Sequence, residues 1–358
     1  MRRLPVYFLI DVSESMVGEP IQQVEAGLGT IIQELKRDPY ALETVFISVV
    51  AFAGKARTIT PLTDVITFYP PRLPIGGGTS LGEGLNHLMR EMTSTIVKTT
   101  LERKGDWKPI VFLFTDGAPT DSYQQALDTW NRDWKNKAQL VAVSFGTSTD
   151  LSILYRLTDN VLVFKNTDAN SYKAFFKWIT ASIQASSQSV NLYSKDDLNL
   201  APVDKHIVDA PPGQSSGGSS GAGAVDNNVA TFLAKCQNTK KPYLIKYDKI
   251  TASSHGDWLG AAGISRGYRL TGAFQVSDDY FQLSQEGAGN ARVNSEELQG
   301  VPNCPCCGNS IGLALCPCGN IFCVDERAQT ATCPWCSRQL RLSAEGSSGG
   351  FDISRTKG

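Results

Sequence analysis

The chain of 358 residues lacks an excess of charge of either sign, a long apolar run and more than three histidines. Its formal net charge of −1 gives no support for a nucleic-acid or membrane-surface role that depends on bulk electrostatics. No apolar segment is long enough to span a bilayer. The first apolar run resembles a signal peptide only briefly, because Asp11 interrupts it and no small-residue cleavage site follows. We therefore expect a cytoplasmic protein, with two or three domains at this length.

Apolar runs alternate with amphipathic stretches through the first half of the chain. Five runs rich in Val, Ile and Phe, with little polar alternation, are typical of strands buried on both faces: 6–10, 45–52, 110–115, 140–145 and 161–164. Helical patterns lie between and after these runs, at 20–37, 80–95, 122–135, 151–157 and 171–186. This alternation predicts a doubly wound α/β fold, in which helices cover both faces of a mostly parallel sheet.

Side chains that offer oxygen atoms follow two of the predicted strands and one glycine-rich turn of this domain. Five of them form the candidate site: Asp11, Ser13, Ser15, Thr79 and Asp116. In an open parallel sheet, ligands bind at the carboxyl ends of the strands, where such loops converge. Three hydroxyls and two carboxylates suit a small hard cation such as Mg²⁺, with Ca²⁺ or Mn²⁺ as alternatives. Because Mg²⁺ retains several waters, such a site leaves a position that an acidic side chain of a partner could fill.

The spacing of these motifs resembles the von Willebrand factor A family with a complete metal-ion-dependent adhesion site. The family pattern DxSxS corresponds to Asp11, Ser13 and Ser15, its threonine to Thr79 and its later aspartate to Asp116. The resemblance covers roughly residues 1–190 and implies that Asp11 and Thr79 reach the metal directly or through water. The alternative is that Asp11 and Ser13 cap a helix, as Asp and Ser commonly do.

The composition changes after this domain. We expect a flexible Gly/Ser-rich linker over 191–228, because the run at 214–224 is too small and polar to be buried. Short strand patterns predict a small β-rich region over 229–300, followed by a cysteine-rich zinc ribbon over 301–343. The Gly/Ser-rich tail over 344–358 is expected to be disordered.

Nine cysteines are present, and eight of them lie between positions 304 and 336. Such clustered CxxC pairs are typical of thiolates that bind zinc, and a redox CxxC would normally stand in a βαβ unit. The simplest assignment gives one structural Zn²⁺ to the two outer knuckles: Cys304, Cys307, Cys333 and Cys336. Four more cysteines are possible additional ligands, for a second zinc or as replacements in the first: Cys316, Cys318, Cys323 and Cys306. Cys236 is expected to be a small buried apolar residue, and His87, His206 and His255 to be ordinary surface or core residues.

An A domain followed by a β-rich stretch and the series CPxCG, CxCG and CPWC resembles the bacterial TerY family of tellurite-resistance and related stress systems. The resemblance covers nearly the whole chain. It implies an intracellular adaptor that works with a protein kinase and a serine/threonine phosphatase.

Three functions are compatible with these motifs. The first is a non-enzymatic protein that binds protein partners through Mg²⁺ and has a structural zinc module. The second is a metal-dependent hydrolase, which would need a base beside the metal, although no histidine lies in these loops. The third is nucleic-acid binding by the ribbon through Arg327, Arg338 and Arg341, a weak patch whose ordinary role is solubility. We favour the first.

Overall fold

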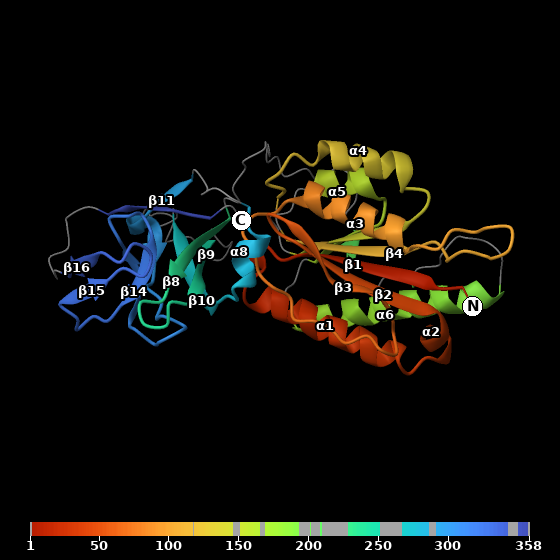
Figure 1. Cartoon of the computed structure of the whole chain (residues 1–358), viewed down its shortest axis with the longest axis horizontal. Coiled ribbons are helices and arrows are strands. Elements are labelled where there is room, and N and C mark those ends of the chain that lie inside the picture. The colour runs from red at the N-terminus through yellow and green to blue at the C-terminus, as the bar shows by residue number, and fades with distance from the viewer. Residues whose placement is uncertain are drawn as a thin grey trace, which may run out of the picture.

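The computed structural model describes residues 2–116, 118–145, 151–164, 169–192, 201, 208–209, 228–250, 267–285, 291–342 and 350–356. An α/β domain, hereafter the A domain, and a β-rich C-terminal module lie next to each other along the long axis of the molecule (Figure 1). Among the described residues, no helix has the length and hydropathy needed to cross a membrane.

The A domain is built on a seven-stranded sheet with the order β3-β2-β1-β4-β5-β6-β7. The five inner strands run parallel, and the two edge strands, β3 and β7, run antiparallel to their neighbours. The bounds are β1 (Leu4–Asp11), β2 (Val45–Phe52), β3 (Ala56–Asp64), β4 (Ile110–Thr115), β5 (Gln139–Phe145), β6 (Val161–Phe164) and β7 (Val208–Asp209). This arrangement confirms the doubly wound, mostly parallel sheet.

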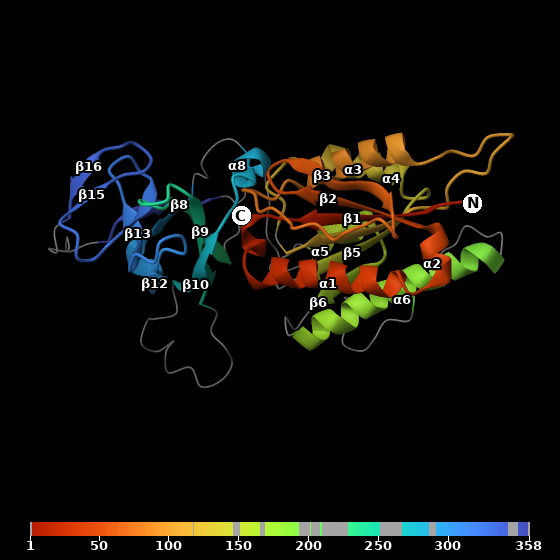
Figure 2. The ribbon, with the colours of Figure 1, turned by 60° about the horizontal axis from the view of Figure 1, so that its bottom comes forward.

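Helices cover both faces of this sheet (Figure 2). One layer holds α1 (Glu19–Leu35), α2 (Pro39–Thr44) and α6 (Ala169–Leu192), and the other holds α3 (Leu81–Thr95), α4 (Gln124–Asp133) and α5 (Leu151–Leu157). The central strand β1 contributes to both cores, because Phe8 packs among the residues of the first layer and Leu9 among those of the second. Burial on both faces is the physical reason for its continuous apolar run.

Some parts of the A domain differ from what the sequence predicts. The edge strand β3 is mostly half-buried and carries no apolar run, so its pattern gave no strand signal. The linker expected over 191–228 begins too early: α6 extends to Leu192, Ala201 is hydrogen-bonded to Trp178 and Ser182 of that helix, and β7 completes the sheet. The Gly/Ser run at 214–224 lies outside the described residues.

The C-terminal module contains a six-stranded sheet with the order β12-β10-β9-β8-β14-β13. Its strands are β8 (Val229–Lys235), β9 (Pro242–Lys249), β10 (Tyr268–Gln275), β12 (Leu298–Gln299), β13 (Ile311–Leu315) and β14 (Ile321–Val324). Two small pairs flank it: β11 (Arg292–Asn294) with β17 (Asp352–Ser354), and β15 (Thr330–Thr332) with β16 (Gln339–Arg341). A short helix, α8 (Asp279–Leu283), faces the A domain (Figure 1).

This module corrects two expectations. The β-rich region and the zinc ribbon are not separate units, because β8 of the former pairs in parallel with β14 of the latter. The tail expected to be disordered over 344–358 contains β17, in which Ile353 is fully buried against the core of the module.

The close packing of α1 on α6 generates a test of the fold. A Cβ atom added at Gly27 would lie 2.1 Å from the Phe176 ring, whereas nothing lies within 4 Å of one added at Gly29. Gly27→Ala is therefore expected to lower the free energy of unfolding by about 1–3 kcal/mol through overpacking. The matched change Gly29→Ala should raise it by up to about 1 kcal/mol through helix propensity. The free energy of unfolding of both variants is measured by urea titration. Equal changes in this free energy for the two variants would contradict the close packing at Gly27.

Candidate functional site

The candidate cation site begins at the carboxyl end of β1. Asp11 is the last residue of this strand and is completely buried. One carboxylate oxygen, Oδ1, accepts a hydrogen bond from the backbone N–H of Ser13 at 2.9 Å, and Oδ2 accepts one from the Thr115 hydroxyl at 2.7 Å. Since Thr115 ends β4, the carboxylate joins the ends of two neighbouring strands.

Hydroxyl groups extend this connection to the second aspartate. The Oγ atoms of Ser13 and Ser15 are 2.9 Å apart, and the Ser15 hydroxyl donates to Asp116 Oδ1 at 2.7 Å. Thr79 lies on the neighbouring loop before α3, where its N–H donates to Thr120 Oγ1 at 2.9 Å and its carbonyl accepts from Thr120 N at 2.8 Å. The structure thus links four of the five predicted residues by hydrogen bonds and holds Thr79 through Thr120.

The chemistry of this donor set fits a divalent cation. Burial raises the pKa of Asp11 to about 6, although the hydrogen bonds from Ser13 and Thr115 lower it in part. An ionised carboxylate that is buried without a cationic partner lowers the stability of the fold. A positive ion nearby offsets this loss of stability. Asp11, Ser13, Ser15 and Asp116, with Thr79, would hold such a cation.

The C-terminal module contacts the loops of this site. Lys246 of β9, only 7% exposed, donates from Nζ to the backbone carbonyl of Ser15 at 2.5 Å. The Tyr280 hydroxyl of α8 donates to the carboxylate of Glu14, which is fully buried between the two serines in sequence. Burial and the neighbouring Glu14 carboxylate raise the pKa of Tyr280, so its hydroxyl stays protonated. Two residues of the DxSxS loop are therefore held by another module.

The glycine loop before Thr79 is held in the same way. The backbone N–H of Gly77 donates to Ser284 Oγ at 2.8 Å, and the Gly77 carbonyl accepts from the N–H of Gln285 at 3.2 Å. Leu283 and Tyr280 pack in the same buried cluster as the first helical layer of the A domain. The two halves thus share a packed interface, although the sequence analysis expected a flexible connection between them.

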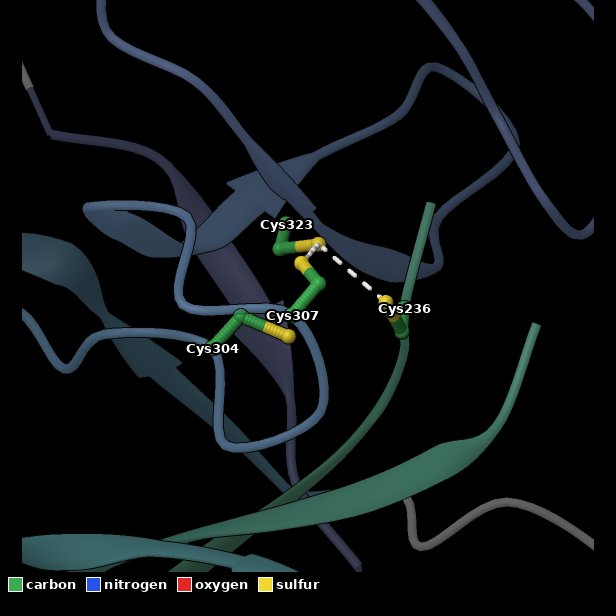
Figure 3. Close-up of side chains that lie close together, drawn as sticks. All are labelled: Cys236, Cys304, Cys307 and Cys323. Carbon is green, nitrogen blue, oxygen red and sulfur yellow. Dashed lines mark hydrogen bonds between the residues drawn. The ribbon is translucent and has the colours of Figure 1, made fainter. Parts of the chain in front are cut away.

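Cysteines of the C-terminal module form two clusters, and the first joins distant parts of the chain (Figure 3). It contains Cys236 after β8, Cys304 and Cys307 of the first knuckle, and Cys323 of β14. The Sγ atoms of Cys307 and Cys323 are 3.7 Å apart, and those of Cys323 and Cys236 are 3.9 Å apart. Tetrahedral Zn²⁺ with Zn–S bonds of about 2.3 Å requires S–S separations of about 3.8 Å, so the set fits zinc.

Backbone donors support this cluster. The N–H groups of Gln237 and Thr239 each lie 3.3 Å from a cluster sulfur, Cys323 Sγ and Cys236 Sγ respectively. Burial raises the pKa of the Cys236 thiol, but hydrogen bonds with Thr239, Cys307 and Asn238 together outweigh this effect and lower that pKa to about 6. Hydrogen-bond donors around a metal site orient its thiolate ligands and stabilise their charge.

The second cluster lies at the outer end of the module and contains Cys316, Cys318, Cys333 and Cys336. The Cys316 and Cys336 sulfurs are 3.7 Å apart, and those of Cys318 and Cys333 are 3.9 Å apart. These separations again match a tetrahedral zinc site.

The expected single zinc at Cys304, Cys307, Cys333 and Cys336 is therefore wrong, because its two knuckles belong to different clusters. Cys236 is not merely a small apolar residue, since it completes the first cluster, and Cys306 lies outside both. The number of cysteines already indicates two zinc sites. Cys306 lies inside the first knuckle, and the other eight of the nine cysteines are enough for two sets of four ligands.

Comparison with known families identifies both halves of the chain. The sequence profile of the von Willebrand factor type A domain matches residues 6–178. The profile described as the TerY-C metal binding domain matches residues 226–358. The chain contains a von Willebrand factor type A domain and a TerY-C metal binding domain. Its A domain is thus a VWA domain, and its C-terminal module is a TerY-C domain that includes both cysteine clusters.

Solved structures match about half of the chain. Proximal thread matrix protein 1 from the mussel byssus matches with a TM-score of 0.39 and 16% identity, over 50% of this chain and 48% of that one. A von Willebrand factor type A protein from Catenulispora acidiphila matches with a TM-score of 0.39 and 18% identity, over 51% and 43%. The chain therefore spans less than half the length of these two structures. No curated protein sequence matches the chain significantly.

The buried carboxylate of Asp11 makes the stability of the metal-free VWA domain depend on pH. Its pKa is raised from 3.8 to about 6, so the carboxylate lowers the free energy of unfolding progressively as the pH rises through this interval. Asp11→Asn should remove a penalty of up to about 3 kcal/mol near pH 7.5 in EDTA, and almost none near pH 4. Added Mg²⁺ should stabilise only the wild type. Denaturant unfolding measures this, and a variant less stable than wild type in EDTA near pH 7.5 would contradict it.

The cluster assignment predicts the metal content of the TerY-C domain. We expect two zinc ions per purified chain, one for each cluster. Cys236→Ser should remove the first and Cys318→Ser the second, because each variant leaves three thiolates in one set. Cys306→Ser is the matched control and should keep both. The zinc content of each variant is measured by elemental mass spectrometry. Loss of zinc from the Cys306 variant would show that the cysteines are wrongly assigned to the two clusters.

Proposed function

We propose that the chain is a non-enzymatic adaptor that binds protein partners through a Mg²⁺-dependent adhesion site. The observation that carries this proposal is the hydrogen-bonded set of Asp11, Ser13, Ser15 and Asp116 at the carboxyl ends of β1 and β4, with Thr79 beside it. Three of the five donors are neutral hydroxyls, and Mg²⁺ takes six oxygen ligands, so the protein leaves a coordination position for an oxygen from outside. The partner group is therefore an acidic side chain.

Catalysis at the same position is the less favourable proposal. Hydrolysis would require a base or nucleophile beside the metal, and the three loops contain no histidine. The nearest additional acid, Glu14, is engaged by Tyr280, and Asp121 accepts a hydrogen bond from the N–H of Glu83 at 3.1 Å at the start of α3. Both acids therefore have structural roles, which leaves binding as the function of the oxygen set.

The TerY-C domain gives this adaptor a second part, placed against the adhesion loops. Its two zinc clusters are structural in this proposal, since a core this small needs metal to fold. By resemblance to the TerY family, the partners are a protein kinase and a serine/threonine phosphatase, and the setting is a cytoplasmic stress response related to tellurite resistance.

The experiment is affinity capture from native lysate on the purified full chain. Wild type in Mg²⁺ should retain a defined partner, and Asp116→Ala should lose it because this change removes one of the two carboxylates. EDTA should have the same effect on wild type. Asp128→Ala is the matched control, since Asp128 is an exposed aspartate on α4 outside the oxygen set and should keep the partner.

Zinc content is measured in every sample, so that loss of the TerY-C domain cannot be mistaken for loss of the adhesion site. Retention of the same partners by Asp116→Ala and in EDTA would overturn the metal-dependent mechanism. A kinase or phosphatase among the partners lost would support the proposed setting.

A further inference from the structure

A second surface lies at the opposite edge of the VWA sheet from the cation site. Three neighbouring hollows lie there, with volumes of about 700, 450 and 320 Å³. The largest shares Thr93, Asp133 and Trp134 with the hollow of 450 Å³. It shares Lys108 with the hollow of 320 Å³. We call these three hollows together the basal groove. The N terminus marks this end of the domain, away from the TerY-C domain (Figure 1).

The strand order explains why charged residues gather in the basal groove. Arg2 precedes β1, Lys108 precedes β4 and Lys137 precedes β5, and these three strands are parallel neighbours. Parallel strands bring their amino ends to one edge, just as their carboxyl ends meet at the other. The groove therefore collects positive charge at the edge opposite the two aspartates of the adhesion site.

Acidic side chains leave much of this charge uncompensated. Two of the acids that line the groove are already paired with arginines, Asp106 with Arg3 at 2.6 Å and Asp133 with Arg132 at 2.9 Å. By contrast, four lysines of the lining form no ion pair with an acid in the described part of the chain: Lys98, Lys108, Lys135 and Lys137. In a chain with a formal net charge of −1, this is a local excess of positive charge.

Two tryptophans form part of the lining of the groove. Trp107 is 9% exposed and Trp130 is completely buried, and the indole N–H of each lacks an acceptor among the described residues. Both indole nitrogens are themselves enclosed, so the polar contacts that the groove can offer a ligand come from its lysines. Met92 and Ile96 provide apolar contact in the central hollow.

These features point to a peptide and against a nucleic acid. A single strand of nucleic acid needs exposed aromatic faces on which its bases stack. Trp107 is buried, with the guanidinium of Arg2 3.5 Å from its ring centroid, so it offers no such platform. The carboxylates of Asp133 and Asp159 also interrupt the lysines and would repel a continuous phosphate backbone. The acidic side chains of a peptide are separate from one another, so they can contact the lysines without lying against Asp133 and Asp159.

We propose that the basal groove binds an acidic segment of a partner protein. Carboxylates of the segment pair with the unpaired lysines. The groove contains none of the five oxygen donors of the cation site, so this binding does not require Mg²⁺ and is independent of the proposed function. With two binding faces at opposite edges of one sheet, the chain can hold two partners at once.

The test is selection of random peptides on the immobilised full chain in EDTA. We expect enrichment of sequences rich in Asp and Glu, and binding of the enriched peptides, measured by fluorescence anisotropy, that weakens with added salt. The triple variant with Lys98→Glu, Lys108→Glu and Lys137→Glu should bind them at least about tenfold more weakly. The matched control carries Lys173→Glu, Lys177→Glu and Lys241→Glu at exposed positions outside the groove and should bind like wild type.

Several outcomes would overturn the proposal. Enriched peptides without an acidic excess would do so, as would equal binding by the groove variant and its control. Labelled oligothymidine that binds wild type as tightly as the peptides, and loses binding in the groove variant, would replace the peptide with a nucleic acid. Zinc content and thermal melting of each variant exclude misfolding as the cause.

Discussion

The buried carboxylate of Asp11 is the constraint on which the polar edge of the VWA domain depends. It stands where an apolar strand ends, and it can remain there because Ser13 and Thr115 donate hydrogen bonds to it. The same bonds fix the direction of the DxSxS loop, which brings Ser15 to Asp116. A fold that buries an acid in this way has a local excess of negative charge, and a divalent cation is the simplest group that balances it.

The TerY-C domain extends this constraint beyond the VWA domain. Lys246 and Tyr280 reach the backbone and the intervening acid of the DxSxS loop, while Ser284 and Gln285 hold Gly77. Each contact fixes a loop that carries residues of the candidate cation site, so the geometry of that site is set jointly by both domains. A lysine near the site also adds positive charge, which favours anionic partners over neutral ones.

Much of the fold could be predicted from the sequence because its signals are local. Continuous apolar runs such as 110–115 identify buried parallel strands, and the alternation in DxSxS places three oxygens in one loop. The missed features depend on contacts between distant residues. Cys236 and Cys323 are 87 positions apart and meet only because β8 pairs with β14, and no local pattern marks Lys246 as a neighbour of Ser15.

The interface at α8 also bears on where this chain can be divided. The VWA profile ends at residue 178, yet Tyr280 and Leu283 pack in the core beside the first helical layer, and Glu14 has its hydroxyl donor on α8. A fragment cut at the profile boundary would expose that apolar surface to water and leave an acid buried without this donor. The boundary between the domains in the sequence therefore differs from the boundary of the packed core. The smallest fragment that preserves the loops of the cation site includes both domains.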